Sequence, residues 1–219
     1  MKPKIIAIIP ALNEEKTIAK VIQGVKPHVD EIIVVDDGSK DQTAINAKEQ
    51  GAVLVSHPRI LGYDRSIADG FALANERNAD IVFTFDADGQ HHPEDIPRLV
   101  DPILRELADV VVGKRPRYAR VTEHLYALVA KAKANIDDPL CGFKVYRMDV
   151  YRDVGYFDRI SSIGTQLVFN AKKKGYRVVQ ESVTVHERAD HSRFGKRIKS
   201  NWKIFMAMGR TILLGGSQG

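Results

Sequence analysis

Residues 4–37 determine the fold, and they read KIIAIIPALNEEKTIAKVIQGVKPHVDEIIVVDD. The apolar runs at residues 4–9 and 31–35 predict two short buried strands. Between them, apolar residues recur at i, i+3, i+4 and i+7 from Ile18 to Val25, which predicts an amphipathic helix that packs on the strands. A strand, a helix and a second strand in this order form the repeating unit of a parallel sheet.

The same alternation continues along the chain. Further strands are predicted at residues 52–56, 81–85 and 110–112, and further helices from about residue 42, at 67–74 and at 94–107. Asp41 is placed to cap the helix that begins near Gln42. The second half is less regular, with helices predicted at 122–134 and 165–174 and extended segments at 143–146 and 178–185. We therefore expect an α/β fold with a Rossmann-like, open, mostly parallel sheet and helices on both faces.

Composition excludes several classes of protein. With 219 residues, of which 44% are hydrophobic and 28% charged, the chain suits one large globular domain rather than a disordered or fibrous protein. The lone cysteine, Cys141, excludes an internal disulfide, and the absence of Cys/His ligand spacing argues against structural zinc. Its apolar neighbours predict a buried thiol rather than a nucleophile. Because the apolar N-terminal run is too short for a signal peptide, we expect a cytoplasmic protein.

The net charge of +5 is concentrated in the last quarter of the chain. It indicates an anionic partner such as phosphate or an anionic membrane, unless the basic residues only form a solvated helix face. Nucleic acid is not expected, because the basic segment lacks interleaved aromatic residues. Residues 195–219 predict a basic amphipathic helix that lies on a membrane without crossing it. The expected division is therefore a main domain of residues 1–194 and this C-terminal helix.

Two pairs of carboxylates follow predicted parallel strands directly. Asp36 and Asp37 follow the strand at 31–35, and Asp86 and Asp88 follow the strand at 81–85. In open α/β sheets ligands bind outside the carboxyl ends of the strands, so both pairs are expected to face one crevice. Asp86 and Asp88 offer the hard oxygen ligands that suit Mg²⁺ or Mn²⁺, and a further ligand or supporting bond is expected from Gln90 or His91.

Acidic residues in such positions also have structural roles. Aspartates in turns also terminate strands and cap helices, which is the preferred interpretation of Asp41 and an equal alternative for Asp36. A calcium EF-hand is excluded, because Gly89 comes too early and the terminal acidic ligand is missing. The sequence contains neither G-x-G-x-x-G nor a P-loop, which argues against dinucleotide enzymes and P-loop kinases.

Five sequence blocks match one protein family in order. They are residues 10–15 (PALNEE), 34–43 (VVDDGSKDQT), 85–91 (FDADGQH), 113–115 (GKR) and 138–144 (DPLCGFK). Together they resemble the family 2 glycosyltransferases of GT-A type, and within them the branch that transfers sugars to dolichyl or polyprenyl phosphates. The blocks are similar to that family's P-x-x-N-E, V-D-D-G-S-x-D-x-T, D-A-D-x-Q-H, G-x-R and D-x-x-C-G-F-K motifs. The resemblance implies a GT-A fold for residues 1–194.

The resemblance also implies roles for individual residues. Those expected to bind the donor nucleoside are Pro10, Asn13, Glu14 and Asp37, the last of them through the base. The expected metal ligands are Asp86, Asp88 and Gln90. The residues expected to act in catalysis are Asp86, Asp88 and Arg115. Phosphate of the donor or acceptor is expected to contact Arg115, Lys131, Arg188, Ser192 and Arg193.

Three segments depart from the family pattern. The loop at residues 57–62 lacks the usual Asn-x-Gly start, and Asp190 and His191 replace the glycine region of the late phosphate-contacting segment, from which His191 is an additional candidate for the metal. Gln166 stands where many relatives carry Glu. Because a phosphate acceptor with a second pKa near about 6 is already largely ionised at neutral pH, it needs no general base, and the Gln favours such an acceptor.

The sequence therefore predicts a metal-dependent, inverting transferase that moves a hexose from GDP-mannose or UDP-glucose to a polyprenyl or dolichyl phosphate. Peripheral contact with the cytoplasmic face of an anionic membrane is part of this prediction. Two alternatives stay open. One is a soluble family 2 enzyme that acts on a sugar or glycerate hydroxyl, and the other is a non-catalytic module that binds the nucleotide sugar.

Overall fold

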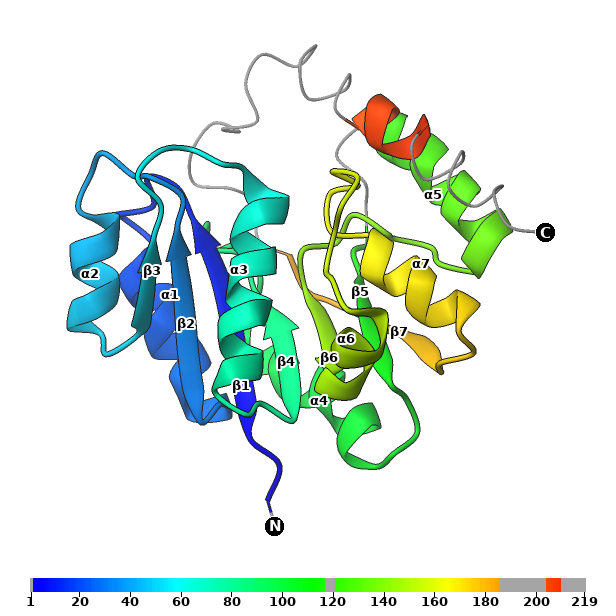
Figure 1. Ribbon diagram of the computed structural model, residues 1–219, viewed down its shortest axis with the longest axis horizontal. Helices are drawn as coiled ribbons and strands as arrows, with labels where there is room; N and C mark the ends of the chain where they lie inside the picture. The colour runs from blue at the N-terminus through cyan, green and yellow to red at the C-terminus, as the bar shows by residue number, and fades with distance from the viewer. Residues whose placement is uncertain (1, 117–120, 186–203, 210–219) are drawn as a thin grey trace.

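A seven-stranded sheet forms the centre of the molecule in the computed structural model, which describes residues 2–116, 121–185 and 204–209 (Figure 1). Its strand order is β3-β2-β1-β4-β6-β5-β7. The strands are β1 (Ile5–Ala11), β2 (Glu31–Asp36), β3 (Val53–Ser56), β4 (Ile81–Thr84), β5 (Val110–Lys114), β6 (Lys144–Arg147) and β7 (Val178–Ser182).

The sheet is mostly parallel, as the sequence predicts. β1 pairs in parallel with β2 and β4, β2 with β3, and β5 with β7, whereas β6 runs antiparallel between β4 and β5. Strands β1 to β3 extend the sheet in one direction and β4 begins the other, so the order reverses between β1 and β4. Such a reversal opens a crevice at the carboxyl ends of the strands, where ligands of open α/β sheets bind.

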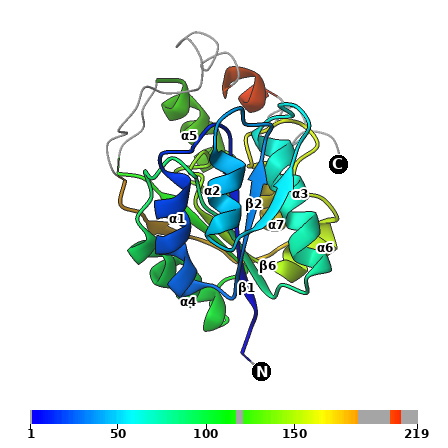
Figure 2. The ribbon, with the colours of Figure 1, turned by 90° about the vertical axis from the view of Figure 1, so that its left-hand side faces the viewer.

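Helices cover both faces of this sheet (Figure 2). The helices are α1 (Ile18–Val25), α2 (Thr43–Glu49), α3 (Tyr63–Glu76), α4 (Ile96–Leu104), α5 (Val121–Ala134), α6 (Met148–Val154) and α7 (Gln166–Lys173). Residues of α1, α2 and α4 contribute to the core on one face, and residues of α3, α5, α6 and α7 to the core on the other. The predicted coverage of both faces is confirmed.

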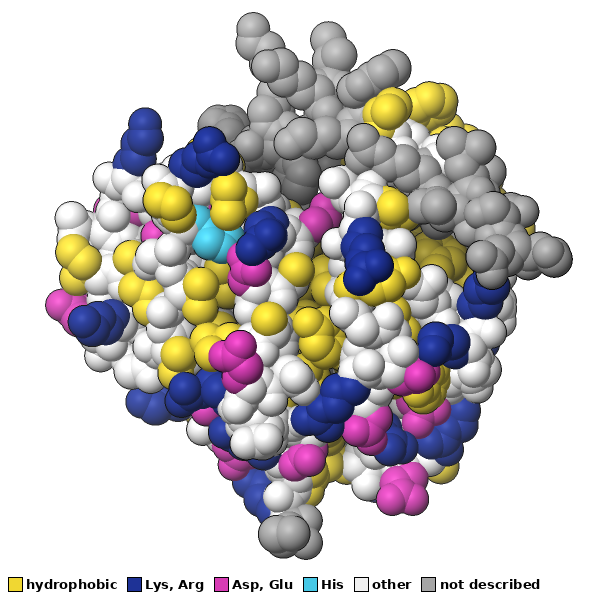
Figure 3. Space-filling view, in the orientation of Figure 1, with side chains coloured by type: hydrophobic (Ala, Val, Ile, Leu, Met, Phe, Trp, Pro, Cys, Tyr) yellow, Lys and Arg dark blue, Asp and Glu magenta, His cyan; other side chains and the backbone are white. Residues whose placement is uncertain are grey.

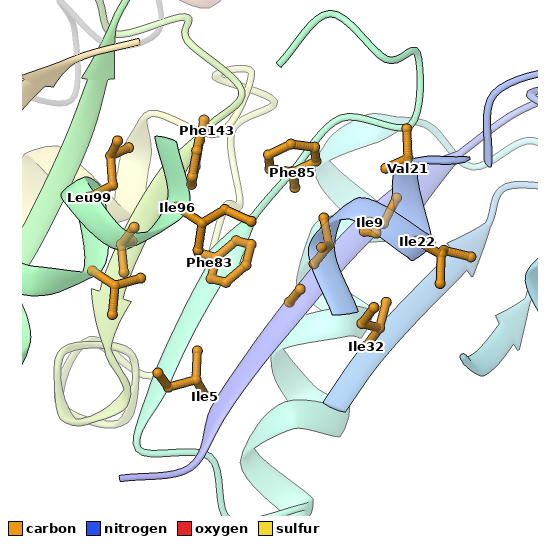
Figure 4. Close-up of a cluster of buried hydrophobic side chains, with 14 of the residues drawn as sticks. Ile5, Ile9, Val21, Ile22, Ile32, Phe83, Phe85, Ile96, Leu99 and Phe143 are labelled. Carbon is orange, nitrogen blue, oxygen red and sulfur yellow. The ribbon is translucent and has the colours of Figure 1, made fainter. Parts of the chain in front are cut away.

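The central strands are buried on both faces, which explains their continuous apolar sequences. In β1, Ile5 and Ile9 join the core under α1 and α4, while Ile6 and Ile8 join the core under α3. Figure 4 shows the first of these cores, where aromatic rings fill the space beside β4. The ring of Phe143 lies 5.7 Å from that of Phe83 and 5.1 Å from that of Phe85, between ring centroids.

Most predicted elements lie within a few residues of their predicted positions. Asp41 Oδ1 accepts the Thr43 N–H at 3.0 Å, so the predicted capping bond at the start of α2 is present. The helix predicted to end at residue 107 ends at Leu104 instead, because Glu106 adopts a left-handed φ of 57° and the Leu107 N–H turns back to the Pro102 carbonyl. Helix α6 and the antiparallel direction of β6 were not predicted.

The predicted C-terminal helix falls mainly outside the described residues. Residues 204–209 are helical and lie beside α5, where Ile204 and Ala207 pack on Tyr126 (Figure 1). No helix in the described ranges has both the length and the apolar character that crossing a bilayer requires. The division into residues 1–194 and 195–219 stays a prediction.

Candidate functional site

The loops that follow β1 and β2 are fastened to each other at the carboxyl edge of the sheet. The Asn13 N–H donates to Ser39 Oγ at 2.8 Å, and the Glu14 N–H donates to Thr43 Oγ1 at 2.7 Å. In return, Asn13 Oδ1 accepts the Lys40 N–H at 2.8 Å. Asn13 has a left-handed φ of 51°, a conformation that Asn tolerates better than most residues. These two sequence blocks therefore form one rigid rim at the carboxyl edge of the sheet, with Pro10 next to the last residue of β1.

Asp37 connects this rim to the loop after β3. Its buried carboxylate accepts the backbone N–H groups of Leu61 at 2.7 Å and Gly62 at 2.8 Å, and Oδ1 lies 2.8 Å from His57 Nδ1. The loop of residues 57–62 lies so close that a Cβ on Gly38 would be 2.8 Å from the Arg59 carbonyl carbon. Asp37 thus positions protein backbone, and the predicted contact with a donor base stays a prediction.

Asp36 makes a local bond. Its Oδ1 accepts the Ser39 N–H at 3.2 Å, and the side chain is buried. This is the turn-forming role that was the alternative for Asp36 in the sequence.

Asp86 stands at the end of β4, against the backbone of Gly142. A Cβ on Gly142 would lie 2.0 Å from Asp86 Oδ2 and 2.6 Å from its Cγ, so only glycine allows this approach. Thr84 Oγ1 holds Gly142 in place by donating to its carbonyl at 2.6 Å. On another side, His91 Nε2 lies 3.4 Å from Asp86 Oδ2, while the Asp86 side chain keeps 30% of its surface exposed. The carboxylate is therefore fixed yet still accessible.

Asp88 and Gln90 form the turn that follows. Gly89 has a φ of 74°, and the Gln90 N–H donates to Asp88 Oδ1 at 3.1 Å. The chain then enters His91, which is buried between the rings of Phe85 and Phe143. The Nδ1 atom of His91 is buried without a hydrogen-bond partner among the described residues. The turn of Asp88 and Gln90 is therefore followed directly by a histidine that is packed in the core.

These residues fit a divalent ion whose coordination the substrate completes. No group of three or more His, Cys, Asp or Glu side chains arranged for a metal occurs in the described part of the chain. Mg²⁺, however, is usually held by one or two carboxylates together with substrate phosphates and water rather than by an all-protein cage. Asp86, next to its partner His91, and Asp88 two residues later match that donor set. Their role as metal ligands, with Gln90, stays a prediction.

Arg115 and Asp138 form a buried ion pair near Asp86. Arg115 donates from Nε to Asp138 Oδ2 at 2.7 Å and from Nη2 to Asp138 Oδ1 at 2.8 Å, and Nη2 also lies 3.1 Å from Glu123 Oε2. The side chain of Asp138 is 1% exposed and that of Arg115 is 19% exposed. Burial would lower the pKa of Arg115, but its bonds to Asp138 raise it above its usual range. The structure therefore shows Arg115 bound to protein carboxylates, and its predicted contact with phosphate stays a prediction.

A second buried cation, Lys144, belongs to the same segment as Gly142. Its Nζ donates to the Cys141 carbonyl at 2.6 Å, and burial lowers its pKa. Burial of Asp86 opposes ionisation, but the His91 contact and the charges of Lys144 and Arg115 outweigh it, so the pKa of Asp86 lies below its ordinary value. The Cys141 thiol is fully buried, which raises its pKa to about 12. The predicted burial of this thiol is confirmed.

A model of a known protein family matches most of the chain. Residues 6–155 match the family model described as glycosyl transferase family 2. The chain belongs to glycosyltransferase family 2. The predicted family is thereby confirmed, and the family assignment supports the prediction of an enzyme.

Individual family 2 relatives extend the comparison. An undecaprenyl-phosphate mannosyltransferase of Micrococcus luteus is 29% identical, and the match covers 84% of this chain and 84% of the relative. A UDP-N-acetylglucosamine–dolichyl-phosphate N-acetylglucosaminyltransferase of Methanococcus voltae is 39% identical over 126 residues, with 49% of this chain and 50% of the relative covered. The chain spans about half the length of that relative and of a Methanocaldococcus jannaschii protein that is also 39% identical.

Similar solved structures confirm the GT-A fold. The glucosyl-3-phosphoglycerate synthase of Mycobacterium tuberculosis, in complex with Mn²⁺, UDP-glucose and phosphoglyceric acid, superposes with a TM-score of 0.75. It is 26% identical, and the match covers 95% of this chain and 80% of that chain. Another structure of this synthase contains Mg²⁺ and UDP.

Of the remaining phosphate candidates of this family 2 chain, Lys131 pairs with a protein carboxylate and the others lie outside the described residues. Lys131 Nζ pairs with Asp137 Oδ1 at 2.6 Å, and Asp137 also pairs with Lys114 at 2.8 Å. The predicted phosphate contacts Arg188, Ser192 and Arg193 lie outside the described residues, as does the metal candidate His191. All of these roles stay predictions.

Gln166 supports a loop in the position where the family resemblance suggests a carboxylate. Its Oε1 accepts the Arg159 N–H at 2.6 Å. In this loop Ser161 and Ile163 have left-handed φ values of 53° and 58°, an outlier for β-branched Ile. Ile163 packs against the cluster around Tyr126 that contains Ile204. The strained loop is thus fixed by α5 and by the helix of residues 204–209.

The carboxyl group of Asp64, which contacts the end of this loop, has a raised pKa. Asp64 accepts the Gly164 N–H at 2.7 Å, yet burial and the charge of Asp158 raise the pKa of Asp64 to about 6. The charge at this place therefore changes between mildly acidic and neutral pH.

Replacing Gly142 by alanine is expected to displace Asp86 without unfolding the protein, because the new Cβ would overlap the carboxylate. We expect Mn²⁺-dependent binding of UDP or GDP, measured by isothermal titration calorimetry, to weaken at least about tenfold, or about 1.4 kcal/mol. Gly209→Ala is the matched control, since a Cβ there meets nothing within 4 Å. Unchanged nucleotide binding in Gly142→Ala would contradict the assigned place of Asp86.

Removing Asp138 leaves a largely buried guanidinium without its main partner. We expect Asp138→Ala to lower the free energy of unfolding by about 3–5 kcal/mol, measured by urea denaturation. Asp101, whose side chain is 50% exposed and pairs with Arg105, provides the control, and Asp101→Ala should cost less than about 1 kcal/mol. Equal effects of the two substitutions would show that the buried pair is not a main support of the fold.

Proposed function

We propose that the chain is a metal-dependent, inverting hexosyltransferase that uses a nucleotide sugar, GDP-mannose or UDP-glucose, and a polyprenyl phosphate acceptor. The observation that carries this proposal is the accessible Asp86 carboxylate, fixed by Gly142 and His91 at the carboxyl end of β4, where the strand order reverses. The names of the Micrococcus luteus and Methanococcus voltae relatives support a polyprenyl phosphate acceptor. The Mn²⁺ and UDP-glucose in the mycobacterial synthase support the metal and donor classes.

In the proposed mechanism, Asp86 and Asp88 would hold Mg²⁺ or Mn²⁺. When bound, the ion would supply positive charge that offsets the charge developing on the leaving nucleoside diphosphate. An oxygen of the acceptor phosphate forms a bond to the anomeric carbon while the bond from that carbon to the diphosphate oxygen breaks, which inverts the configuration. The rigid rim formed by the loops after β1 and β2 orients the donor for this in-line attack.

Deprotonation of the acceptor places little demand on the protein in this scheme. A phosphate monoester with a second pKa near about 6 is mainly dianionic at neutral pH. Gln166, whose Oε1 is bound to the Arg159 backbone, is not a general base, which agrees with an acceptor that has no proton to lose.

A hydroxyl acceptor is the second candidate, supported by the structural similarity to glucosyl-3-phosphoglycerate synthase. Incubation with GDP-mannose or UDP-glucose and Mn²⁺, in the presence of either a polyprenyl phosphate or 3-phosphoglycerate, separates the two. Transfer to the lipid phosphate supports our proposal, and transfer to phosphoglycerate alone supports the second candidate. Tight nucleotide-sugar binding without transfer or donor hydrolysis would identify the non-catalytic module.

An exposed apolar surface suits contact with the membrane that carries such an acceptor. On α5, Val121, Leu125 and Leu128 are 78%, 47% and 68% exposed and recur at i, i+4 and i+7 on one face, which we call the α5 apolar face. Phe205 and Met206 are also exposed, and hydrophobic side chains gather over residues 204–209 and α5 at the upper right of Figure 3. An apolar face next to basic residues is typical of peripheral membrane binding.

Asp88→Ala is expected to abolish transfer while the fold stays intact. Loss of a metal ligand removes electrostatic stabilisation of the leaving diphosphate, and we expect turnover in a radiolabelled sugar-transfer assay to fall at least about 100-fold, or about 2.7 kcal/mol. Circular dichroism should be unchanged. Asp101→Ala, on the exposed surface of α4, should transfer at the wild-type rate. Near-normal turnover in Asp88→Ala would count heavily against a metal-dependent mechanism.

Leu128→Glu is expected to weaken membrane binding, because it places a charge in the α5 apolar face. We expect the fraction of protein that sediments with vesicles containing anionic lipid to fall several-fold, and the fall to be absent with Leu107→Glu. Leu107 is similarly exposed, at 63%, but lies before the amino end of β5, whereas α5 follows the carboxyl end of that strand. Equal sedimentation of both variants and the wild type would remove the α5 apolar face from the proposal.

A further inference from the structure

His57 is a buried polar residue to which neither the sequence motifs nor the proposed chemistry gives a role. It lies directly after β3, and its side chain is only 6% exposed. Its backbone N–H donates to the Asp36 carbonyl at 2.9 Å, which continues the pairing of β2 and β3. The imidazole ring therefore sits between the end of β2 and the first turns of α3.

Both nitrogens of this ring face carboxylate oxygens. Nδ1 lies 2.8 Å from Asp37 Oδ1, and Nε2 lies 3.0 Å from Asp69 Oδ2. Asp37 already accepts two backbone N–H groups, and Asp69 Oδ2 accepts the Arg65 Nε–H at 2.7 Å, so both carboxylates act as acceptors. A neutral imidazole has one donor and one acceptor nitrogen, and its lone pair would face one of these oxygens. With both carboxylates ionised, the two contacts are both hydrogen bonds only when each ring nitrogen carries a proton.

The contacts of His57 hold the loop of residues 57–62 in place. Asp37 holds the backbone at Leu61 and Gly62, and His57 completes the set of donors around it. Through Asp69 and Arg65 the ring also anchors the loop to α3. With both nitrogens engaged and the ring buried, His57 is not placed to exchange protons with a substrate.

The location of this loop relates it to the donor. The carboxylate Asp86 at the end of β4 would mark the diphosphate, and the α5 apolar face, on the other half of the sheet, would mark the acceptor side. The donor nucleoside then extends across the ends of β1, β2 and β3, where the rim and residues 57–62 lie.

We propose that His57, as an imidazolium ion bridging Asp37 and Asp69, is a positioning residue that fixes residues 57–62 as the nucleoside side of the donor site. This inference rests on the proposed function for the identity of the ligand, but the bridge itself is a property of the free protein. A loop held in this way binds a nucleoside without first having to be ordered, which favours affinity.

The protonation state can be measured without any ligand. In ¹⁵N-histidine NMR spectra at pH 7, both ring nitrogens of His57 are expected to carry protons, with the signals assigned by their absence in His57→Leu. Asp69→Asn should convert the ring to a single protonated nitrogen, because the second anionic acceptor is gone. A singly protonated ring in the wild-type protein would overturn the proposal.

The positioning role can be measured in two further ways. In His57→Leu, amide hydrogen exchange at Leu61 and Gly62 is expected to accelerate at least tenfold, and the Kd for UDP or GDP with Mn²⁺ to rise at least tenfold. In the transfer assay the donor KM should rise while kcat stays within about twofold of wild type, which a general loss of stability would not produce. His28→Leu, the same change before the amino end of β2 rather than after the carboxyl end of a strand, should leave all of these values unchanged.

Each outcome bears on one of the two proposals. If His57→Leu folds and both the amide exchange and the nucleotide Kd are unchanged, the positioning role is overturned. If His57→Leu does not fold, His57→Asn replaces it, since its amide reaches toward Asp37 but not Asp69, and an unchanged Kd and exchange rate in that variant overturn the bridge. If the wild-type protein binds neither UDP nor GDP with Mn²⁺, the proposed function fails, while the NMR and exchange measurements still decide the role of His57.

Discussion

The approach of the Gly142 backbone to the Asp86 carboxylate is the constraint around which the site is arranged. Gly142 lies in a seven-residue segment, 138–144, that has no regular structure until β6 begins. Polar contacts connect this segment to two strands: Asp138 binds Arg115 directly after β5, and Thr84 on β4 binds the Gly142 carbonyl. The buried Lys144 ammonium lies among these carboxylates and offsets their charge. A single segment therefore joins two strands and positions the carboxylate between them.

The sequence predicted the parallel half of the fold because local patterns suffice there. Strands buried on both faces read as continuous apolar runs, and the amphipathic period of α1 matches the side that packs on them. The antiparallel β6 could not be predicted in the same way. Its direction depends on pairing with β4, some 60 residues earlier, and on β5, and no short-range pattern of residues 143–147 distinguishes it from a parallel strand.

The site residues that belong to motifs could be predicted from the sequence. The contacts that depend on packing in the folded protein could not. The motif blocks placed Asp86, Asp88 and Asp37 at strand ends, and their position at one edge follows from a parallel sheet. The contacts of His57 were not predicted, because one of them is made to Asp69, which lies on the facing helix and belongs to no motif. The engagement of Arg115 by Asp138 and Glu123 was also invisible, since residue type alone does not reveal which partner a buried guanidinium takes.

The position of β6 in the sheet has a consequence for synthesis on the ribosome. Strands β1 to β4 lie in the first 84 residues and form a continuous half-sheet, but the open side of β4 is covered only by residues 144–147. Until that stretch emerges, the nascent half-sheet exposes an apolar edge, and Asp86 has no Gly142 backbone to rest against. The rim formed by the loops after β1 and β2 is thus complete within residues 11–43, whereas alignment of the carboxylate needs residues 142–147, about 100 residues further along the chain.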